Sequence, residues 1–166
     1  MMTPELNIRH LRAFRETART KSASAAGHME HLTQSAITQA IAGIESKVGI
    51  RLFDRRSDGM HLTEAGEGFY ARVVRAFEHL ETGAQEALRL GHRQGNRGFP
   101  EFQRLLTFAQ LRALIAMDDA NSFSIAARTA GVAQPSLHRA ARNIEQLSGL
   151  TLFKSAPEGV SLTRAA

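Results

Sequence analysis

The fold is decided by residues 22–66, which read SASAAGHMEHLTQSAITQAIAGIESKVGIRLFDRRSDGMHLTEAG. Small residues at 25–27 suit a helix that packs closely against a neighbour, and Thr33 offers a hydroxyl that can cap the next helix. Apolar side chains then recur every three or four residues, which is typical of the buried face of a helix. They are Ile37, Ile41, Ile44 and Val48. This pattern predicts two short helices joined by a turn, which together form a helix-turn-helix.

A β-hairpin is predicted directly after the second helix. Gly49 ends that helix. Residues 52–56 and 60–62 are two short strand-like runs, and the turn residues Ser57, Asp58 and Gly59 separate them. A hairpin at this place would be the wing of a winged helix-turn-helix.

Residues 6–90 resemble the winged helix-turn-helix region of the LysR-type transcriptional regulators. The matching residues agree in order and without gaps; they are Leu11, Ser22, Ala26, Gln34-Ser35-Ala36-Ile37, Ile44-Glu45, Gly49, Leu52-Phe53, Arg55 and Leu62-Thr63-Glu64-Ala65-Gly66. The resemblance implies a DNA-binding fold followed by a linker helix through which two subunits dimerise. Glu30 departs from the family, which has a core leucine there, and we expect Met29 or Leu32 to fill that space.

The chain repeats itself with an offset of 100 residues. The recurring groups include Leu11-Arg12-Ala13 with Leu111-Arg112-Ala113, Ser22 with Ser122, Gln34 with Gln134, Ile44-Glu45 with Ile144-Glu145, Leu52-Phe53 with Leu152-Phe153, and Leu62-Thr63 with Leu162-Thr163. Pro135 in the second repeat is compatible with the first turn of a helix, where the backbone amide has no partner to lose. We therefore expect a mainly α protein with two winged helix-turn-helix units, each of three helices and a hairpin, joined by a long linker helix.

Residues 63–90 predict that single long helix. Its apolar stripe follows near-heptad spacing and suits packing against a partner helix; the stripe is formed by Phe69, Val73, Phe77, Leu80, Ala84 and Leu88. We expect homodimerisation through it. The alternative is that the stripe folds back on its own domain.

Four segments follow from these patterns. The first winged helix-turn-helix covers residues 1–66, and the linker helix covers 67–90. Residues 91–100, rich in glycine and polar side chains, predict a flexible hinge. The second winged helix-turn-helix covers 101–166 and opens with a helix over 101–120.

The expected chemistry is recognition of DNA rather than catalysis. In the first repeat the expected reading residues are Thr33, Gln34, Ser35, Thr38 and Gln39, because a glutamine carboxamide can bond adenine at two atoms in the major groove. Gln34 and Ser35 can also hold a phosphate at the helix start. The alternative is that these residues form only a solvated helix face.

The wing of the first repeat carries two arginines. Arg55 and Arg56 are placed to reach phosphate or the minor groove. The alternative role of these two arginines is an ion pair with Asp54 or Asp58.

The second repeat offers a different set of expected DNA contacts, which are Gln134, Pro135, Ser136, His138, Arg139 and Arg142. Arg139 can bond a guanine at two atoms. The wing lacks both arginines, which weakens anchoring to phosphates. The second repeat can therefore bind DNA weakly, bind another sequence, or act as a protein-interaction module.

Composition sets further limits. The net charge is +5, from 21 Lys and Arg against 16 Asp and Glu. This total does not identify a binding partner, so the basic residues have to be considered separately on each surface of the protein. Cysteine is absent, which excludes disulfides and thiolate metal sites. No apolar run is long enough to span a membrane and no signal-peptide pattern is present, so we expect a cytoplasmic protein.

No cofactor, metal site or enzymatic activity is expected. His28 and His31 lie in a turn with no third ligand nearby, and no nucleophile is paired with a base. The resemblance implies a sequence-specific transcriptional regulator that binds double-stranded DNA. We expect the chain to be the N-terminal portion of a longer protein, in which a following sensor domain would respond to a small-molecule inducer.

Overall fold

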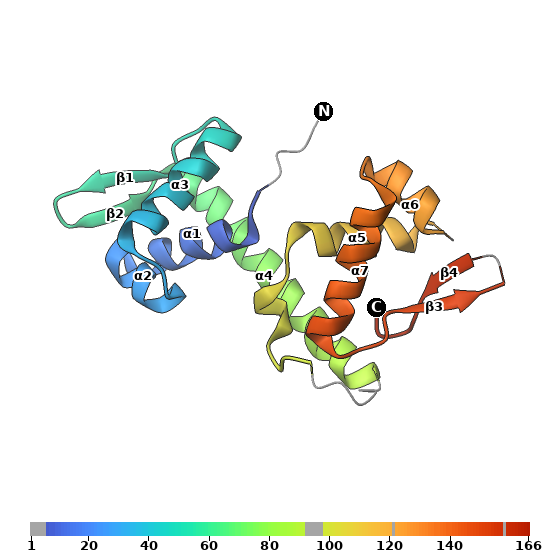
Figure 1. The fold of residues 1–166 in the computed structure, drawn as a ribbon. Coiled ribbons are helices and arrows are strands. Elements are labelled where there is room, and N and C mark those ends of the chain that lie inside the picture. Colours follow the sequence, from blue (N-terminus) through green and yellow to red (C-terminus); the bar gives the residue numbers. More distant parts are fainter. Residues whose placement is uncertain (1–5, 92–97, 121, 158) are drawn as a thin grey trace. The chain divides into compact units, whose positions relative to one another are not determined.

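The computed structural model describes residues 6–91, 98–120, 122–157 and 159–166 (Figure 1). The chain divides into two compact units, unit 1 over Met1–Glu78 and unit 2 over His79–Ala166. Each unit contains three consecutive helices followed by a two-stranded antiparallel hairpin. Unit 1 holds α1 (Ile8–Thr20), α2 (Ala23–Glu30), α3 (Gln34–Val48), β1 (Phe53–Arg56) and β2 (Gly59–Leu62). Unit 2 holds η1 (Phe102–Leu105), α5 (Phe108–Asp118), α6 (Phe123–Ala130), α7 (Gln134–Ser148), β3 (Phe153–Ala156) and β4 (Gly159–Leu162).

Helix α3 begins and ends where the sequence predicts. The Thr33 side chain accepts a hydrogen bond from the backbone N–H of Ala36, and Gly49 adopts a left-handed conformation after the last turn. Its buried residues are Ile37, Ala40, Ile41 and Ile44. In unit 2, Pro135 lies in the first turn of α7 as expected, although the capping residue Ala133 has no side chain that can bond.

The expectation for Met29 and Leu32 is wrong. Both side chains point outward, with exposed fractions of 52% and 42%. The turn is closed by backbone instead, because Gly27 has no Cβ and the carbonyl oxygen of Leu32 would lie 2.6 Å from one. The Leu32 N–H donates to the Gly27 carbonyl at 2.9 Å. A close backbone approach thus replaces the expected apolar side chain.

A glutamate carboxylate ties each hairpin to the helix before it. Oε1 of Glu45 accepts hydrogen bonds from the backbone N–H groups of Leu52 and Phe53, at 2.7 and 3.2 Å. Oε1 of Glu145 accepts the same pair of bonds in unit 2, at 2.8 and 3.1 Å. We call this arrangement the glutamate clamp. It fixes where the first strand of each hairpin starts.

Threonine hydroxyl groups tie the two strands together at the same open end of each hairpin. Thr63 Oγ1 donates to the carbonyl of Arg51 at 2.8 Å, and Thr163 Oγ1 donates to the carbonyl of Thr151 at 2.8 Å. The strand registers also correspond, with Phe53 opposite Leu62 and Phe153 opposite Leu162. The two units therefore share their local backbone chemistry.

An aromatic cluster fills the core of unit 1. Phe14 is fully buried, and its ring centroid lies 5.2 Å from Phe53, 5.0 Å from Phe69 and 6.4 Å from Tyr70. Such edge and tilted contacts are favourable for aromatic rings. The cluster joins α1, the hairpin and the first part of α4 (Glu64–Leu90) into one core.

The expected single helix over 101–120 is interrupted. Leu106 and Thr107 are extended and separate η1 from α5. Thr107 and Gln110 form a reciprocal capping box, in which the Thr107 N–H donates to Oε1 of Gln110 at 2.7 Å. This cap starts a new helix at Phe108, because it satisfies amides that would otherwise lack a partner.

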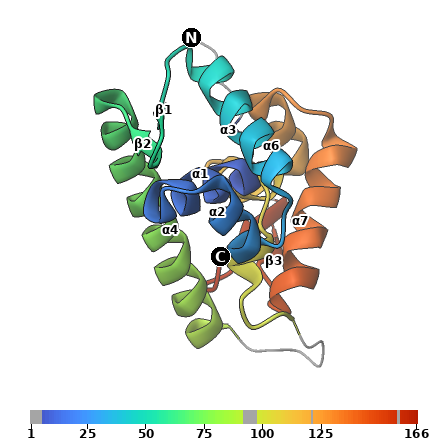
Figure 2. The same cartoon turned by 90° about the vertical axis from the view of Figure 1, so that its left-hand side faces the viewer.

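Helix α4 confirms the prediction of one long helix, and Figure 2 shows it unbroken. Its stripe packs on its own chain. Phe69, Val73 and Phe77 belong to the core of unit 1, whereas Leu80, Ala84 and Leu88 belong to a core of unit 2. These contacts support the alternative that the stripe folds back, and the expected homodimer interface stays a prediction. Within the described ranges, no helix combines the length and apolar character that crossing a membrane requires.

The two compact units meet inside α4, because the two ends of the helix pack on different cores, and the expected segment bounds at residues 66, 90 and 100 stay a prediction. Residues 92–97 of the expected hinge lie outside the described residues. Gly98, at its end, is buried, and the Phe99 N–H donates to the carbonyl of Leu147 at 2.8 Å. A Cβ on Gly98 would collide with Ser148, so this position requires glycine.

Replacing the clamp glutamate should loosen the hairpin. For Glu45→Ala we expect a loss of about 1–3 kcal/mol in the free energy of unfolding, because two partly buried amides lose their acceptor. Urea denaturation measures this loss, and hydrogen exchange should show faster exchange at Leu52 and Phe53. Glu145→Ala is the matched variant and should act on Leu152 and Phe153 only. Unchanged exchange at these amides would contradict a structural role for the clamp.

Candidate nucleic-acid interface

The start of α3 gathers the expected reading residues of unit 1 on one surface. Thr33, Gln34, Ser35, Thr38 and Gln39 line an open depression of about 640 Å³. All are exposed except Thr38, which is half-buried. The exposed residues stand at the first turns of a helix whose N-terminal amides point outward, and such a helix end favours negatively charged groups.

Hydroxyl and carboxamide groups on this surface have different tasks. Thr33 Oγ1 caps the helix and lies 3.0 Å from Oγ of Ser35, while Thr38 Oγ1 donates to the carbonyl of Gln34 at 3.0 Å. Among the described residues, the carboxamides of Gln34 and Gln39 have no hydrogen-bond partner. They are therefore the groups on this surface that remain available to a base edge.

Two arginines extend from the wing. Arg55 and Arg56 lie exposed on β1, and neither forms an ion pair within the described part of the chain. The expected competitor Asp58 is bonded to His61 instead, with 3.0 Å between Oδ1 and Nε2. That hydrogen bond lowers the pKa of the Asp58 carboxyl, and the charge of Arg56 acts in the same direction. Both guanidinium groups are thus left for an external anion.

Sequence reasoning missed Lys21 beside the wing. Its carbonyl accepts a hydrogen bond from the Met60 N–H at 2.9 Å, and its Cβ approaches Gly59, which lies opposite Arg56. Lys21 is exposed and adopts a left-handed conformation after α1, with φ of 55°. A residue with left-handed conformation after a helix is usually glycine. The lysine at this position was therefore the signal that the sequence offered. It brings another cation to this end of the hairpin.

In unit 2 the corresponding helix start is chemically different. Gln134, Pro135, Ser136 and Arg139 are exposed on α7. His138 is half-buried, and its ring stacks on Phe123 with centroids 3.8 Å apart and planes 25° apart. The stacking orients the imidazole against α6 rather than leaving it free. The remaining exposed groups include one guanidinium, that of Arg139, where unit 1 has Gln39.

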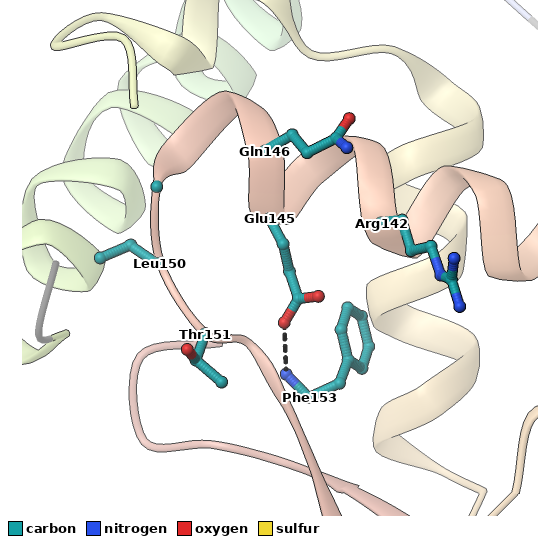
Figure 3. A pocket seen from close by; sticks show the side chains of 7 residues that line it. Arg142, Glu145, Gln146, Leu150, Thr151 and Phe153 are labelled. Carbon is teal, nitrogen blue, oxygen red and sulfur yellow. Dashed lines mark hydrogen bonds between the residues drawn. The ribbon is translucent and has the colours of Figure 1, made fainter. Parts of the chain in front are cut away.

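Arg142 lies further along α7, beside the glutamate clamp (Figure 3). It lines an open depression of about 370 Å³ with Gln146 and Thr151. Figure 3 shows the Glu145 carboxylate directed at the backbone nitrogen of Phe153 rather than at Arg142. No ion pair of Arg142 is found among the described residues, so its charge is also available to a phosphate.

The wing of unit 2 carries less positive charge. Lys154 and Ser155 are exposed on β3, in the places that Asp54 and Arg55 take on β1. Ala156 replaces Arg56.

Across the described residues, no group of three or more His, Cys, Asp or Glu side chains could hold a metal ion. The arrangement is that of two polar helix starts, each with a hairpin beside it.

Comparisons with known proteins follow the same division. Residues 8–67 and 108–166 match the bacterial regulatory helix-turn-helix proteins of the lysR family. The chain is 30% identical over 159 residues to the HTH-type transcriptional regulator GalR of Pseudomonas putida, which covers 96% of this chain and 38% of GalR. It is 32% identical over 95 residues to the HTH-type transcriptional regulator PcaQ of Agrobacterium fabrum, which covers 55% of this chain and 30% of PcaQ.

A solved structure is also similar. The crystal structure of the CbnR_DBD-DNA complex aligns with 47% of this chain and 90% of that chain, at 28% identity and a TM-score of 0.45. The chain spans less than half the length of GalR and of PcaQ. The two family matches together cover well over half of the described residues. This chain belongs to the lysR family of bacterial regulatory helix-turn-helix proteins.

Proposed function

We propose that the chain is the sequence-specific DNA-binding portion of a longer transcriptional regulator. One observation carries this proposal: Gln34 and Gln39 present unbonded carboxamides on the same exposed helix start. The unpaired guanidinium groups of Arg55 and Arg56 lie on the hairpin that the clamp holds to that helix. Carboxamides suit base edges and guanidinium groups suit phosphates.

The similar proteins support the proposal that the chain is part of a longer transcriptional regulator. GalR and PcaQ are named as HTH-type transcriptional regulators, and both are longer than the chain. A small-molecule inducer enters this proposal only through a sensor domain in such a longer protein. The proposed partner of the chain itself is double-stranded DNA.

We also propose that the two units arose by tandem duplication. The offset of 100 residues, the same order of elements, the paired glutamate clamps and the two family matches support this proposal. Homodimerisation through α4 stays a prediction, and sedimentation equilibrium with and without DNA measures it. A dimer built on the apolar stripe would require Val73 and Ala84 to leave cores in which both are buried.

Unit 2 has a second candidate function, because it carries exposed isoleucines at two positions where unit 1 has other residues. Ile115 and Ile125 have exposed fractions of 66% and 50%, where unit 1 has Arg15 and Ala25. Exposed apolar side chains favour contact with another protein. Direct DNA contact by Arg139 is the proposed function, and a protein-interaction module is the alternative.

Base reading by unit 1 is tested by Gln39→Ala. A lost bidentate contact should reduce discrimination at one base pair by about 1–3 kcal/mol. The measurement is selection of bound sequences from a random DNA pool with the full chain, followed by affinities for single-base variants of the consensus. Gln85→Ala, an exposed glutamine on α4, is the control and should leave the consensus unchanged. No enrichment by the unmodified chain would overturn the DNA-binding proposal.

The wing arginines should anchor the backbone of DNA without reading its sequence. Replacing Arg55 and Arg56 with alanine should weaken binding to all sequences alike and make the slope of log affinity against log salt shallower by about 2. Fluorescence anisotropy at several salt concentrations measures the slope. The double replacement with lysine keeps both charges and should largely keep the slope. A change of consensus with an unchanged slope would contradict phosphate anchoring.

Arg139→Ala separates the two functions of unit 2. If Arg139 contacts a guanine, the variant should lose about 1–3 kcal/mol on the selected site and relax the preference at one position. Ile115→Ser is its counterpart on the apolar surface and should leave DNA affinity unchanged. The interaction module predicts the reverse, with unchanged DNA binding in Arg139→Ala and lost self-association or partner binding in Ile115→Ser.

A further inference from the structure

A lysine at the end of α1 holds an unusual backbone conformation. Lys21 follows the last turn of the helix with φ of 55° and ψ of 19°. This left-handed region is strained for a residue that has a Cβ, and glycine or asparagine normally takes it. Among the described residues, Lys21 and His31 alone are non-glycine residues with positive φ. The backbone at position 21 therefore does not account for the presence of a lysine.

Lys21 is bonded to the outer edge of the wing. The Met60 N–H donates to the Lys21 carbonyl at 2.9 Å, so this edge of β2 meets Lys21, whereas the other edge pairs with β1. Gly59 fits here because it has no side chain, since an added Cβ would lie 2.5 Å from the Lys21 carbonyl oxygen. Arg56 lies opposite Gly59 on β1. Cationic residues therefore stand at both edges of the hairpin, next to its turn.

These cations have no anion bound to them within the described part of the chain. Lys21, Arg55 and Arg56 are exposed, and no ion pair of any of them is found there. The Asp58 carboxylate, in the turn of the hairpin, is hydrogen-bonded to His61 at 3.0 Å. Like charges gathered in one place repel each other, and a bound anion relieves that repulsion. This end of unit 1 is therefore suited to an external anion.

Unit 2 lacks a cation at each of the three corresponding positions. By the offset of 100 residues, Lys21 corresponds to Asn121, and the two wing arginines correspond to Ser155 and Ala156. Asparagine suits left-handed backbone better than lysine does. The lysine thus occurs in the repeat whose wing is basic, and not in the repeat whose wing has lost its arginines. This pairing indicates that the lysine and the arginines serve the same ligand.

We propose that Lys21 contacts a phosphate of the DNA bound to unit 1, at the edge of the wing formed by β2. This inference rests on the proposed DNA-binding function and adds a residue to it. An ammonium group is a compact charge that suits a phosphate oxygen, and such a contact positions the protein without reading the sequence. Because the Lys21 backbone is bonded to Met60, the lysine and the wing engage the DNA backbone together.

The first test compares the unmodified chain with Lys21→Asn on a duplex of mixed sequence, by fluorescence anisotropy at several salt concentrations. One lost phosphate contact should make the slope of log affinity against log salt shallower by about 1, because fewer counterions are released. Lys21→Arg keeps the charge and should keep the slope. Arg75→Gln is the matched control, since it removes one positive charge from an exposed position of α4, and it should leave the slope unchanged.

Thermal unfolding separates this role from a structural one. A cation at a helix C-terminus can also stabilise the helix through its dipole, and losing that interaction should lower the temperature of unfolding. Asparagine suits the left-handed backbone, so for a phosphate contact Lys21→Asn should unfold at the same or a higher temperature while binding DNA more weakly. A lower temperature of unfolding with an unchanged salt slope would overturn the proposal.

A second measurement locates the contact on the DNA. The chain contains no cysteine, so Lys21→Cys accepts a single thiol-attached iron chelate, which cleaves DNA that lies nearby. The cuts should overlap those made from Arg56→Cys, and Arg75→Cys should give none. Cuts from Arg56→Cys without cuts from Lys21→Cys would contradict the proposed contact.

The proposed function and this inference fail in different ways. Absence of DNA binding by the unmodified chain would overturn both. If the chain binds DNA and the salt slope falls on replacing Arg55 and Arg56 but not in Lys21→Asn, the proposed function stands and the role of Lys21 is wrong.

Discussion

The glutamate clamp is the constraint on which the arrangement of each unit depends. One carboxylate oxygen near the end of α3 or α7 accepts two consecutive backbone amides at the start of the hairpin. A backbone N–H group forms a stronger hydrogen bond with a charged carboxylate than with a neutral acceptor. It therefore fixes the hairpin relative to the helix that carries the reading residues. Together with the packing of Phe53 on Phe14, it sets the separation between the exposed arginines of the wing and the carboxamides of α3.

Helix α4 supplies both units with apolar side chains, which are aromatic in unit 1 and aliphatic in unit 2. It gives Phe69 and Tyr70 to the aromatic core of unit 1 and gives Leu80, Ala84 and Leu88 to a core of unit 2. The apolar face, whose heptad spacing predicts packing against a partner helix, therefore packs against residues of the same chain.

The two units share a backbone plan and differ in surface chemistry. Glutamate clamps, threonine bonds and strand registers correspond between them, whereas Gln39, Arg55 and Arg56 have Arg139, Ser155 and Ala156 as counterparts. A fold does not determine a function, which depends on the side chains that the fold presents. Exposed Ile115 and Ile125, in the places of Arg15 and Ala25, extend this difference to α5 and α6.

The sequence by itself determined the elements whose signals are local. The Thr33 cap, the spacing from Ile37 to Ile44, the hairpin turn and the length of α4 all follow from residues within a few turns of each other. It also placed the polar residues of α3 on one surface, since helical spacing does so. It did not reveal the clamp, the outward side chains of Met29 and Leu32 or the break before Phe108.

Only the tertiary structure decided what covers the stripe of α4. An apolar stripe looks the same in sequence whether it meets another chain or its own, because burial depends on distant residues. The physical basis is that local patterns fix backbone conformation, whereas packing is settled by side chains that meet from segments far apart in the chain.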